Sequence, residues 1–412
     1  MTTTTIAVIG AGIGGLAAAA ALHRRGIDVH VYERGDTLRE QGVGMHLGPN
    51  GTRLLTRMGL AGQLARKAVR PEALEVRAFH DGSTVARQEM GAAWEERFGA
   101  PYLTVHRGDL HRMLASLLPA ERVHTGRELT GYEESAKGVT LRFAGGTVTR
   151  ASALIGADGV HSLVRRRPAG PERPVYSGNC ALRGLVDAAA LPDLDPALMY
   201  MFAGPAGRVL LYPVSGGRQF TYVAVTPAPE GPDESWTSAA GPADLDAALA
   251  GWAPQVRALV GAARDVRRWA LYDRAPLERW STARTTLLGD AAHPMLPHHG
   301  QGANQAIEDG VALAICLKEE ASGAAGIAAA LRRYEATRRP HTTRVQLGSR
   351  DGRPTTTEKR NSSMNTNLGN TGSNNNRNVN NQAADVAWIL ANDVEANLND
   401  NHVANTLHSN AA

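Results

Sequence analysis

The chain has 412 residues, of which 43% are hydrophobic and 20% charged, so it is long enough for two domains with a sizeable core. Its formal net charge of +4 is small and scattered, which argues against binding of nucleic acid. No apolar run reaches the roughly 18 residues of a membrane span, and the start lacks the basic region of a signal peptide. Two distant cysteines, Cys180 and Cys316, suit a reducing cytoplasm and predict no metal cluster.

The N-terminal segment predicts one βαβ unit. Residues Ile6 to Ile9 form an apolar, β-branched run typical of a strand. Glycines follow, and then the alanine-rich stretch Leu16 to Leu22 predicts a helix that ends before Gly26. A second apolar run, Val29 to Tyr32, completes the unit.

Four further segments are predicted along the chain. They are a hairpin over 139–148, paired strands over 209–214 and 220–225, a helix over 244–260, and a strand, turn and helix over 285–317. We therefore expect a nucleotide-binding domain formed by residues 1–174 and 271–350. A substrate-binding β-sheet domain is expected over 175–270.

The C-terminal extension, 351–412, differs in composition from the rest. Residues 1–360 contain three asparagines and residues 361–412 contain sixteen. Residues 361–381 have too little apolar surface to offset chain entropy, so we expect disorder there. Residues 383–398 have apolar positions near helical spacing and predict a docked helix.

A dinucleotide fingerprint follows the first strand. Gly10-Ala11-Gly12-Ile13-Gly14-Gly15 fits G-x-G-x-x-G, in which the first glycine permits a tight turn, the second admits a pyrophosphate and the last lets helix and strand pack closely. Glu33 ends the next strand, where a carboxylate accepts hydrogen bonds from an adenosine ribose. An acid there disfavours a cofactor that carries a 2′-phosphate, so the site is predicted to bind FAD or NAD. The alternative is a glycine-rich turn without a ligand.

Two more glycine–aspartate motifs occur after apolar strands. Asp158 lies in residues 156–162 and Asp290 in residues 288–294. Either alone would be an ordinary Asx-turn or helix cap. Together with the fingerprint, they predict a site that holds the polyol part of a dinucleotide.

These three motifs resemble those of the class A flavoprotein aromatic hydroxylases, the para-hydroxybenzoate hydroxylase superfamily, over about residues 5–350. The resemblance implies an α/β fold, with a Rossmann-like FAD-binding domain of the glutathione-reductase type and a mixed β-sheet substrate domain. It also implies a monooxygenase that uses FAD, NAD(P)H and O2, without a separate NAD(P)H domain. A small aromatic acid would be hydroxylated through a C4a-hydroperoxyflavin.

Within the superfamily, residues 42–50, 102–110 and 293–298 are most similar to 6-hydroxynicotinate 3-monooxygenase, and then to salicylate 1-hydroxylase and 3-hydroxybenzoate 6-hydroxylase. Two departures argue against hydroxynicotinate as the substrate. Arg208 stands where that enzyme has a histidine, and the cysteine of its substrate site has no match here.

The resemblance also implies which residues bind the cofactor. Asp290 would bind the ribityl chain, Asp158 would lie near the pyrophosphate, and Arg107 would contact the phosphate or ribityl groups. The remaining residues expected to bind the cofactor are Arg34 and, at the start of the helix after the third motif, Gly302 and Ala303. The alternative for Arg107 is a surface salt bridge with Asp109.

Hydroxylation of a phenol needs a base, or hydrogen bonds that favour phenolate. By resemblance, His46 lies along the flavin, Tyr212 faces the substrate and His298 borders the isoalloxazine ring, and these are the candidate catalytic residues. Each has a structural alternative, namely local hydrogen bonding and packing. Arg208 and Pro297 are the candidate substrate-binding residues, because a guanidinium pairs with a carboxylate through two hydrogen bonds.

Three points stay open. Residues Arg165 to Arg167 would either attract NAD(P)H or form a solvated basic face. The same frame also suits a tailoring oxygenase for a larger polyketide or indole substrate, or a flavin-binding protein without activity. The chain would act as a monomer or a homodimer.

Overall fold

A computed structural model describes residues 4–38, 42–170, 172, 174–204, 207–228, 238–320 and 323–351. The predicted disordered segment and the predicted helix over 383–398 lie outside these residues. Among the described helices, none is long and apolar enough to cross a membrane.

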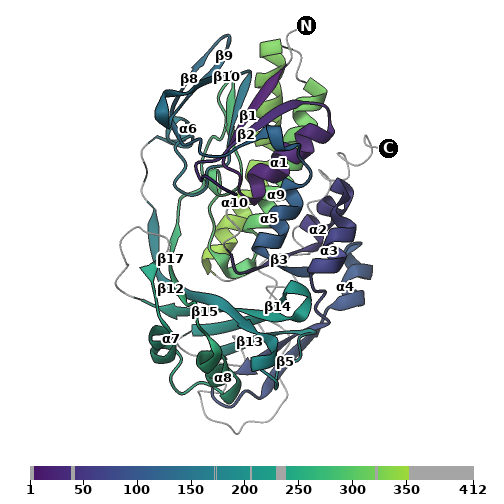
Figure 1. Ribbon diagram of the computed structural model, residues 1–412, viewed down its shortest axis with the longest axis vertical. Helices are drawn as coiled ribbons and strands as arrows, with labels where there is room; N and C mark the ends of the chain where they lie inside the picture. Colours follow the sequence, from purple (N-terminus) through teal and green to yellow (C-terminus); the bar gives the residue numbers. More distant parts are fainter. Residues whose placement is uncertain are drawn as a thin grey trace, which may run out of the picture.

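The predicted βαβ unit is confirmed and forms the centre of a five-stranded sheet (Figure 1). Its first strand, β1 (Thr5–Ile9), pairs in parallel with both β2 (Asp28–Tyr32) and β11 (Ala153–Gly156). In sheet order the strands are β18 (Thr285–Leu287), β11 (Ala153–Gly156), β1 (Thr5–Ile9), β2 (Asp28–Tyr32) and β7 (Val123–His124). The carboxyl ends of β1, β11 and β18 thus carry the three glycine motifs at one edge, where ligands bind in open α/β sheets.

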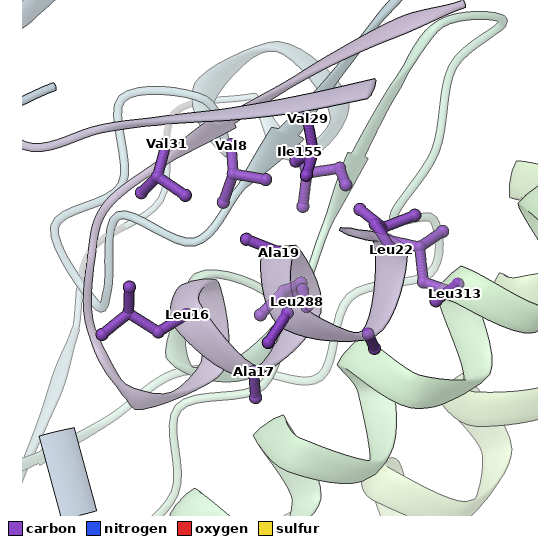
Figure 2. Close-up of a cluster of buried hydrophobic side chains, with 14 of the residues drawn as sticks. Val8, Leu16, Ala17, Ala19, Leu22, Val29, Val31, Ile155, Leu288 and Leu313 are labelled. Atoms are coloured by element: carbon purple, nitrogen blue, oxygen red, sulfur yellow. The ribbon is translucent and has the colours of Figure 1, made fainter. Parts of the chain in front are cut away.

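Small side chains bring helix α1 (Ile13–Arg24) close to its neighbours. Figure 2 shows Ala19 and Leu22 of α1 facing Val29 and Ile155 of the sheet. On helix α9 (Gly302–Glu320), a Cβ at Gly310 would lie 2.7 Å from the backbone of α1, so only glycine fits there. This close packing places the N-termini of α1 and α9 beside the same glycine motifs.

A second, eight-stranded sheet lies below the nucleotide-binding part in Figure 1. Its strands, in sheet order, are β16 (Ser238–Ala239), β17 (Arg267–Asp273), β12 (Val175–Asp187), β15 (Gln219–Pro227), β14 (Gly207–Val214), β13 (Leu198–Gly204), β4 (Ala73–Ala78) and β5 (Thr84–Glu89). The paired strands predicted over 209–225 are β14 and β15. Strands β4 and β5 lie within the segment 1–174, so the sheet also draws on residues outside 175–270.

The two faces of this sheet have different neighbours. Helices α7 (Pro242–Ala248) and α8 (Pro254–Ala262) pack on one face against Leu211 and Tyr222. The single helix predicted over 244–260 is wrong, because Gly251 adopts a left-handed φ of 77° and Pro254 starts a new helix. The other face, with Tyr212 and Leu210, points towards the nucleotide-binding part.

A two-stranded ribbon connects the two sheets. It pairs β3 (Gly44–Leu47) with β6 (Leu103–His106), and β3 packs against β14 and β15 (Figure 1). A three-stranded sheet holds the predicted hairpin, β9 (Gly138–Phe143) and β10 (Val148–Ala151), with β8 (Leu129–Ser135). The remaining helices are α2 (Pro49–Leu55), α3 (Ala61–Lys67), α4 (Gly91–Phe98), α5 (Arg107–Ala115), α6 (Arg166–Ala169) and α10 (Gly323–Asp351).

Candidate active site

The glycines of the first motif have different local surroundings. Gly10 has a φ of 102°, and a Cβ on Gly15 would lie only 2.0 Å from its carbonyl oxygen. A Cβ on Gly14 would meet Leu288 at 2.9 Å. A Cβ on Gly12 would meet nothing within 4 Å. Three of the glycines therefore close the turn, whereas Gly12 leaves space in front of the uncapped N-terminus of α1, where phosphates bind.

The Glu33 carboxylate braces this loop. One oxygen accepts a hydrogen bond from Ala11 N at 2.9 Å, and the other accepts one from Gly35 N at 3.0 Å. Each carboxylate oxygen has a second lone pair for another donor. Arg34, next in sequence, is exposed on the same turn.

Asp158 acts as a cap for its own turn. Its carboxylate accepts hydrogen bonds from the backbone N–H groups of Leu163 and Val164, at 2.7 and 3.2 Å, and from the Ser162 hydroxyl. The Asp158 side chain is thus bonded as in the alternative prediction for this motif, an ordinary Asx-turn or helix cap. The backbone of the same turn packs on Gly10 and supports the glycine loop.

Asp290 and Arg107 carry opposite charges, and each shifts the pKa of the other. The Asp290 side chain is exposed, yet enough protein surrounds it that desolvation raises the pKa of its carboxyl group, while the charges of His293 and Arg107 lower it. Burial likewise lowers the pKa of Arg107 and Asp290 raises it. The alternative for Arg107, a surface salt bridge with Asp109, is not seen among the described residues, where Asp109 pairs with Arg112 at 2.6 Å and with Lys67 at 3.8 Å.

Helix α9 begins directly beside Asp290. A Cβ on Gly302 would lie 3.8 Å from the Asp290 carboxylate, and both Gly302 and Ala303 are half-buried in the first turn. Asn304 ties this turn to β3 by donating to His46 O at 3.2 Å. The N–H groups at this end provide a positive dipole end for an anionic group.

His46 and Tyr212 pack against each other between β3 and β14. Their ring centroids lie 4.1 Å apart, and His46 Nδ1 shares a 2.7 Å hydrogen bond with the Tyr102 hydroxyl. Desolvation lowers the pKa of His46 to about 3 and raises that of Tyr212 to about 12. Both groups are therefore neutral near pH 7, so His46 acts as a hydrogen-bonding group and is a weak base.

His298 lies in the short 3-10 turn Pro297–His299, in which Pro297 is exposed. Its Nδ1 lies 2.9 Å from the Ser349 carbonyl oxygen. A carbonyl only accepts, so Nδ1 carries the proton. Burial and the nearby charge of Arg208 lower the pKa of His298 to about 3, which leaves Nε2 as an acceptor.

Arg208 is the second residue of β14 and lies four residues before Tyr212, on the same face of the sheet. It is half-buried, and desolvation lowers the pKa of its guanidinium. Among the described residues, no hydrogen bond or ion pair to its side chain is found. A desolvated guanidinium without a counter-charge is costly, and a carboxylate ligand would provide that charge.

The basic run after the second motif divides into two parts. Arg165 is buried and donates to the carbonyl oxygens of Ala291 and Ala292, at 3.0 and 2.9 Å. For this residue, the predicted attraction of NAD(P)H and the predicted solvated basic face are therefore both wrong. It ties the second motif to the third. Arg166 and Arg167 are exposed.

Sequence reasoning missed two sets of residues. Arg183, on β12, has a guanidinium nitrogen 3.5 Å from Gly44 O on β3, and no local motif marks it. Asp309, buried on α9, accepts hydrogen bonds from Gly289 N at 3.0 Å and from Arg338 Nε at 2.8 Å, and its Oδ2 lies 2.6 Å from His293 Nε2. Only its place at the end of the third motif could have pointed to it.

Taken together, the site fits FAD. The space at Gly12, the helix N-termini at Ile13 and Gly302, and the Asp290 carboxylate lie along one edge of the sheet, as a dinucleotide requires. No group of three or more potential metal ligands occurs in the described ranges.

Comparison with known proteins identifies relatives that bind FAD or are named as monooxygenases. Residues 3–348 match the family described as FAD binding domain. The chain is 46% identical to 3-amino-4-hydroxybenzoate 2-monooxygenase of Streptomyces platensis, over 84% of this chain and 87% of the relative. It is 40% identical to 6-hydroxynicotinate 3-monooxygenase of Bordetella bronchiseptica, over 84% and 90%.

A solved structure is also similar. HpxO of Klebsiella pneumoniae, complexed with FAD and uric acid, matches with a TM-score of 0.77 and 33% identity, over 85% of this chain and 87% of that chain. The predicted fold class and cofactor are thereby confirmed. The chain belongs to the FAD binding domain family and is a flavoprotein monooxygenase.

Proposed function

We propose that this enzyme hydroxylates a small aromatic acid that carries a ring hydroxyl group, using NAD(P)H and O2. The observation that carries the proposal is Arg208, a desolvated guanidinium without a partner among the described residues. It lies near Tyr212 and His298, which would contact the same ring. The first candidate substrate is 3-amino-4-hydroxybenzoate, because an enzyme named for it is 46% identical.

In this proposal Arg208 binds the substrate carboxylate. A planar guanidinium donates two parallel hydrogen bonds to a carboxylate, and each is strengthened by charge. Burial of Arg208 removes competing water and increases that strength. The acid thereby fixes one end of the ring, and the reacting carbon is held in one orientation.

The ring hydroxyl would lie between Tyr212 and His298. Tyr212 keeps its proton and donates it in a hydrogen bond, because its pKa is about 12. His298 Nε2 accepts, because Ser349 holds the proton on Nδ1. One donor and one acceptor at the hydroxyl favour an electron-rich ring, while the apolar residues Met199 and Leu210 exclude water.

FAD, when bound, would supply the oxidising equivalent after its reduction by NAD(P)H and reaction with O2. Asp290, Arg107 and the first turns of α1 and α9 would hold it. The N-terminus of α9 would stabilise negative charge on the reduced ring system.

The test is NADH or NADPH oxidation by the purified, FAD-loaded chain, with product analysis and a peroxide assay. Substrates would be 3-amino-4-hydroxybenzoate, 6-hydroxynicotinate, salicylate, 3-hydroxybenzoate and the matching carboxamides. A hydroxylated product from an acid, with little turnover of its amide, supports the proposal. Turnover only of a bulkier indole or polyketide would contradict it and favour a tailoring oxygenase.

A pair of variants tests the role of Arg208. Arg208→Gln should raise KM for the acid about 10- to 150-fold, the equivalent of the roughly 1.5–3 kcal/mol of hydrogen bonds to a charged group. The amide should be affected little, since its carbonyl needs no counter-charge. Arg218→Gln is the control, because Arg218 is exposed on the next turn. An equal loss in both variants would rule out a carboxylate contact.

We also propose a cytoplasmic location, because the enzyme would need NAD(P)H and both cysteines are free and buried. The chain would work as a monomer or a homodimer. Light scattering of the FAD-loaded protein distinguishes the two states.

A further inference from the structure

His111 is a buried histidine on α5, outside the three glycine motifs. Its side chain is 5% exposed, and its Nε2 lies 2.6 Å from the backbone carbonyl oxygen of Ala11 in the first motif. A carbonyl oxygen only accepts, so Nε2 carries the proton and donates it. Burial of a polar ring is unfavourable unless the ring is hydrogen-bonded, and here the bond joins two segments that lie 100 residues apart in the sequence.

Side chains hold two consecutive peptide groups of the glycine loop. Glu33 Oε2 accepts a hydrogen bond from Ala11 N at 2.9 Å and so holds the peptide between Gly10 and Ala11. His111 holds the next peptide, between Ala11 and Gly12, through its carbonyl oxygen. Each peptide group is planar and trans, but the two backbone dihedrals of Ala11 that join them are soft. The Glu33 contact alone therefore does not fix the second peptide, and the His111 contact does.

The direction of the Gly12 N–H follows from this contact. In a trans peptide the carbonyl oxygen and the N–H point in opposite directions. Because His111 holds the Ala11 oxygen from the α5 side, the Gly12 N–H points away from α5. Within the part of the chain that the structure describes, no acceptor is found for this N–H, and a Cβ on Gly12 would meet nothing within 4 Å. The donor is thus available to a phosphate oxygen at the N-terminus of α1.

Helix α5 also carries Arg107, which lies four residues before His111 and therefore on the same side of the helix. Arg107 packs along the segment before β3, where a Cβ on Gly42 would lie 2.7 Å from the Arg107 Cβ. One side of α5 thus carries both the histidine that holds the glycine loop and the guanidinium that would contact the cofactor.

We propose that His111 is a positioning residue for the FAD pyrophosphate, and that it acts through the peptide between Ala11 and Gly12. Its hydrogen bond keeps the Gly12 N–H directed at the phosphate position before FAD binds, so the loop is already ordered. Without this bond the peptide rotates, and part of the binding free energy is lost because the loop has to be ordered on binding. The inference concerns the cofactor and is independent of the substrate.

The experiment compares His111→Leu with His111→Gln in FAD titrations of the apoprotein, followed by flavin fluorescence. His111→Leu removes the donor and should raise the FAD Kd by about tenfold or more, and tenfold corresponds to about 1.4 kcal/mol. The amide nitrogen of glutamine can take the place of Nε2, so His111→Gln should recover most of that loss. Should His111→Leu fail to fold, His111→Asn replaces it, because its shorter side chain does not bring an amide to Ala11 O.

Two further measurements separate this role from simple packing of α5. Met113→Ala is the matched control, because Met113 is similarly buried on the same helix and packs in the apolar core. It should lower the apoprotein Tm and change the FAD Kd little. Phosphorus NMR of the protein at saturating FAD reports the pyrophosphate directly. Its resonances should shift in His111→Leu and stay unchanged in Met113→Ala.

An unchanged FAD Kd in His111→Leu would overturn the inference, and so would equal losses of affinity in His111→Leu and Met113→Ala. If His111→Gln bound FAD no better than His111→Leu, the size of the ring and not its hydrogen bond would matter, and the inference would be wrong. None of these outcomes affects the proposed substrate, because FAD binding is measured without one.

Discussion

His298 Nδ1 lies 2.9 Å from the backbone carbonyl oxygen of Ser349, near the end of α10. This contact determines which nitrogen of the ring carries its proton, because a carbonyl oxygen accepts only. The Ser349 hydroxyl also accepts a hydrogen bond from Leu296 N at 3.2 Å, so the helix holds the whole turn at two points. A long helix far along the chain thereby sets the chemistry of a loop in the site.

We predict that His298→Leu lowers kcat/KM for the hydroxylated product by about 10- to 100-fold, because it removes an acceptor worth roughly 1–3 kcal/mol at a buried site. His298→Gln should retain more activity, since its amide oxygen can reach a similar position. The measurement is steady-state product formation, together with the peroxide released per NAD(P)H. Equal activity of His298→Leu and wild type would show that the ring only packs.

The histidines illustrate what a sequence leaves out. Residue type alone suggests a base with a pKa of about 6.5. In the fold, β14 and α10 cover His46 and His298, and burial lowers the pKa of each to about 3. That shift depends on segments more than a hundred residues away in the case of His46, so no local pattern could have predicted it.

The glycine motifs illustrate the opposite case. G-x-G-x-x-G describes a turn whose requirements are local, and the turn, the helix α1 and the parallel strands formed as expected. Two of its glycines have different roles: Gly12 leaves space for the ligand, and Gly15 lets the helix pack on the turn. An experiment can distinguish these two roles.

Gly12→Ala should leave the apoprotein stable but weaken FAD binding. Its φ of −72° suits alanine, and the added Cβ meets no protein atom within 4 Å, so it would enter the space where the pyrophosphate binds. Gly15→Ala should destabilise the apoprotein by at least about 1–3 kcal/mol, because its Cβ would overlap Gly10 O. Thermal unfolding without FAD and FAD titration distinguish the two.

Gly131→Ala provides the matched control for both glycine variants, because a Cβ there also meets nothing within 4 Å and the residue lies on β8, away from the motif. It should change neither the apoprotein Tm nor the FAD Kd. If Gly12→Ala bound FAD as tightly as Gly131→Ala does, the pyrophosphate would lie elsewhere.

Sequence reasoning could not find the role of Asp309 for a different reason: its partners come from two segments outside its own helix. His293 and Gly289 belong to the third motif, and Arg338 lies on α10. Helix α9 has two acids in succession here, the half-buried Glu308 and the buried Asp309, and a periodic pattern does not show which of them is buried. In the fold, Asp309 connects α9 with α10 and with the turn that carries Asp290.

Asp309→Asn should lower the free energy of unfolding by about 1.5–3 kcal/mol at pH 7, because it removes one of the two carboxylates that pair with Arg338 and leaves Glu308 as the remaining counter-charge. Its ion pairs hold the pKa of Asp309 at about 2, below the ordinary 3.8. A lowered carboxyl pKa adds stability above the unfolded value, and this is lost as pH falls through the folded one. The difference between variant and wild type should therefore be constant above about pH 5 and shrink below about pH 4.

Urea unfolding of the apoprotein at several pH values measures this difference. Glu319→Gln is the control, because its ion pair with Arg333 is largely exposed and worth at most about 1 kcal/mol. Asp309→Asn should also weaken FAD binding, since Asp309 holds the Gly289 turn that presents Asp290. An Asp309→Asn loss no larger than that of Glu319→Gln would mean that the buried ion pair contributes little and that packing of α9 on α1 and α10 positions Asp290 by itself.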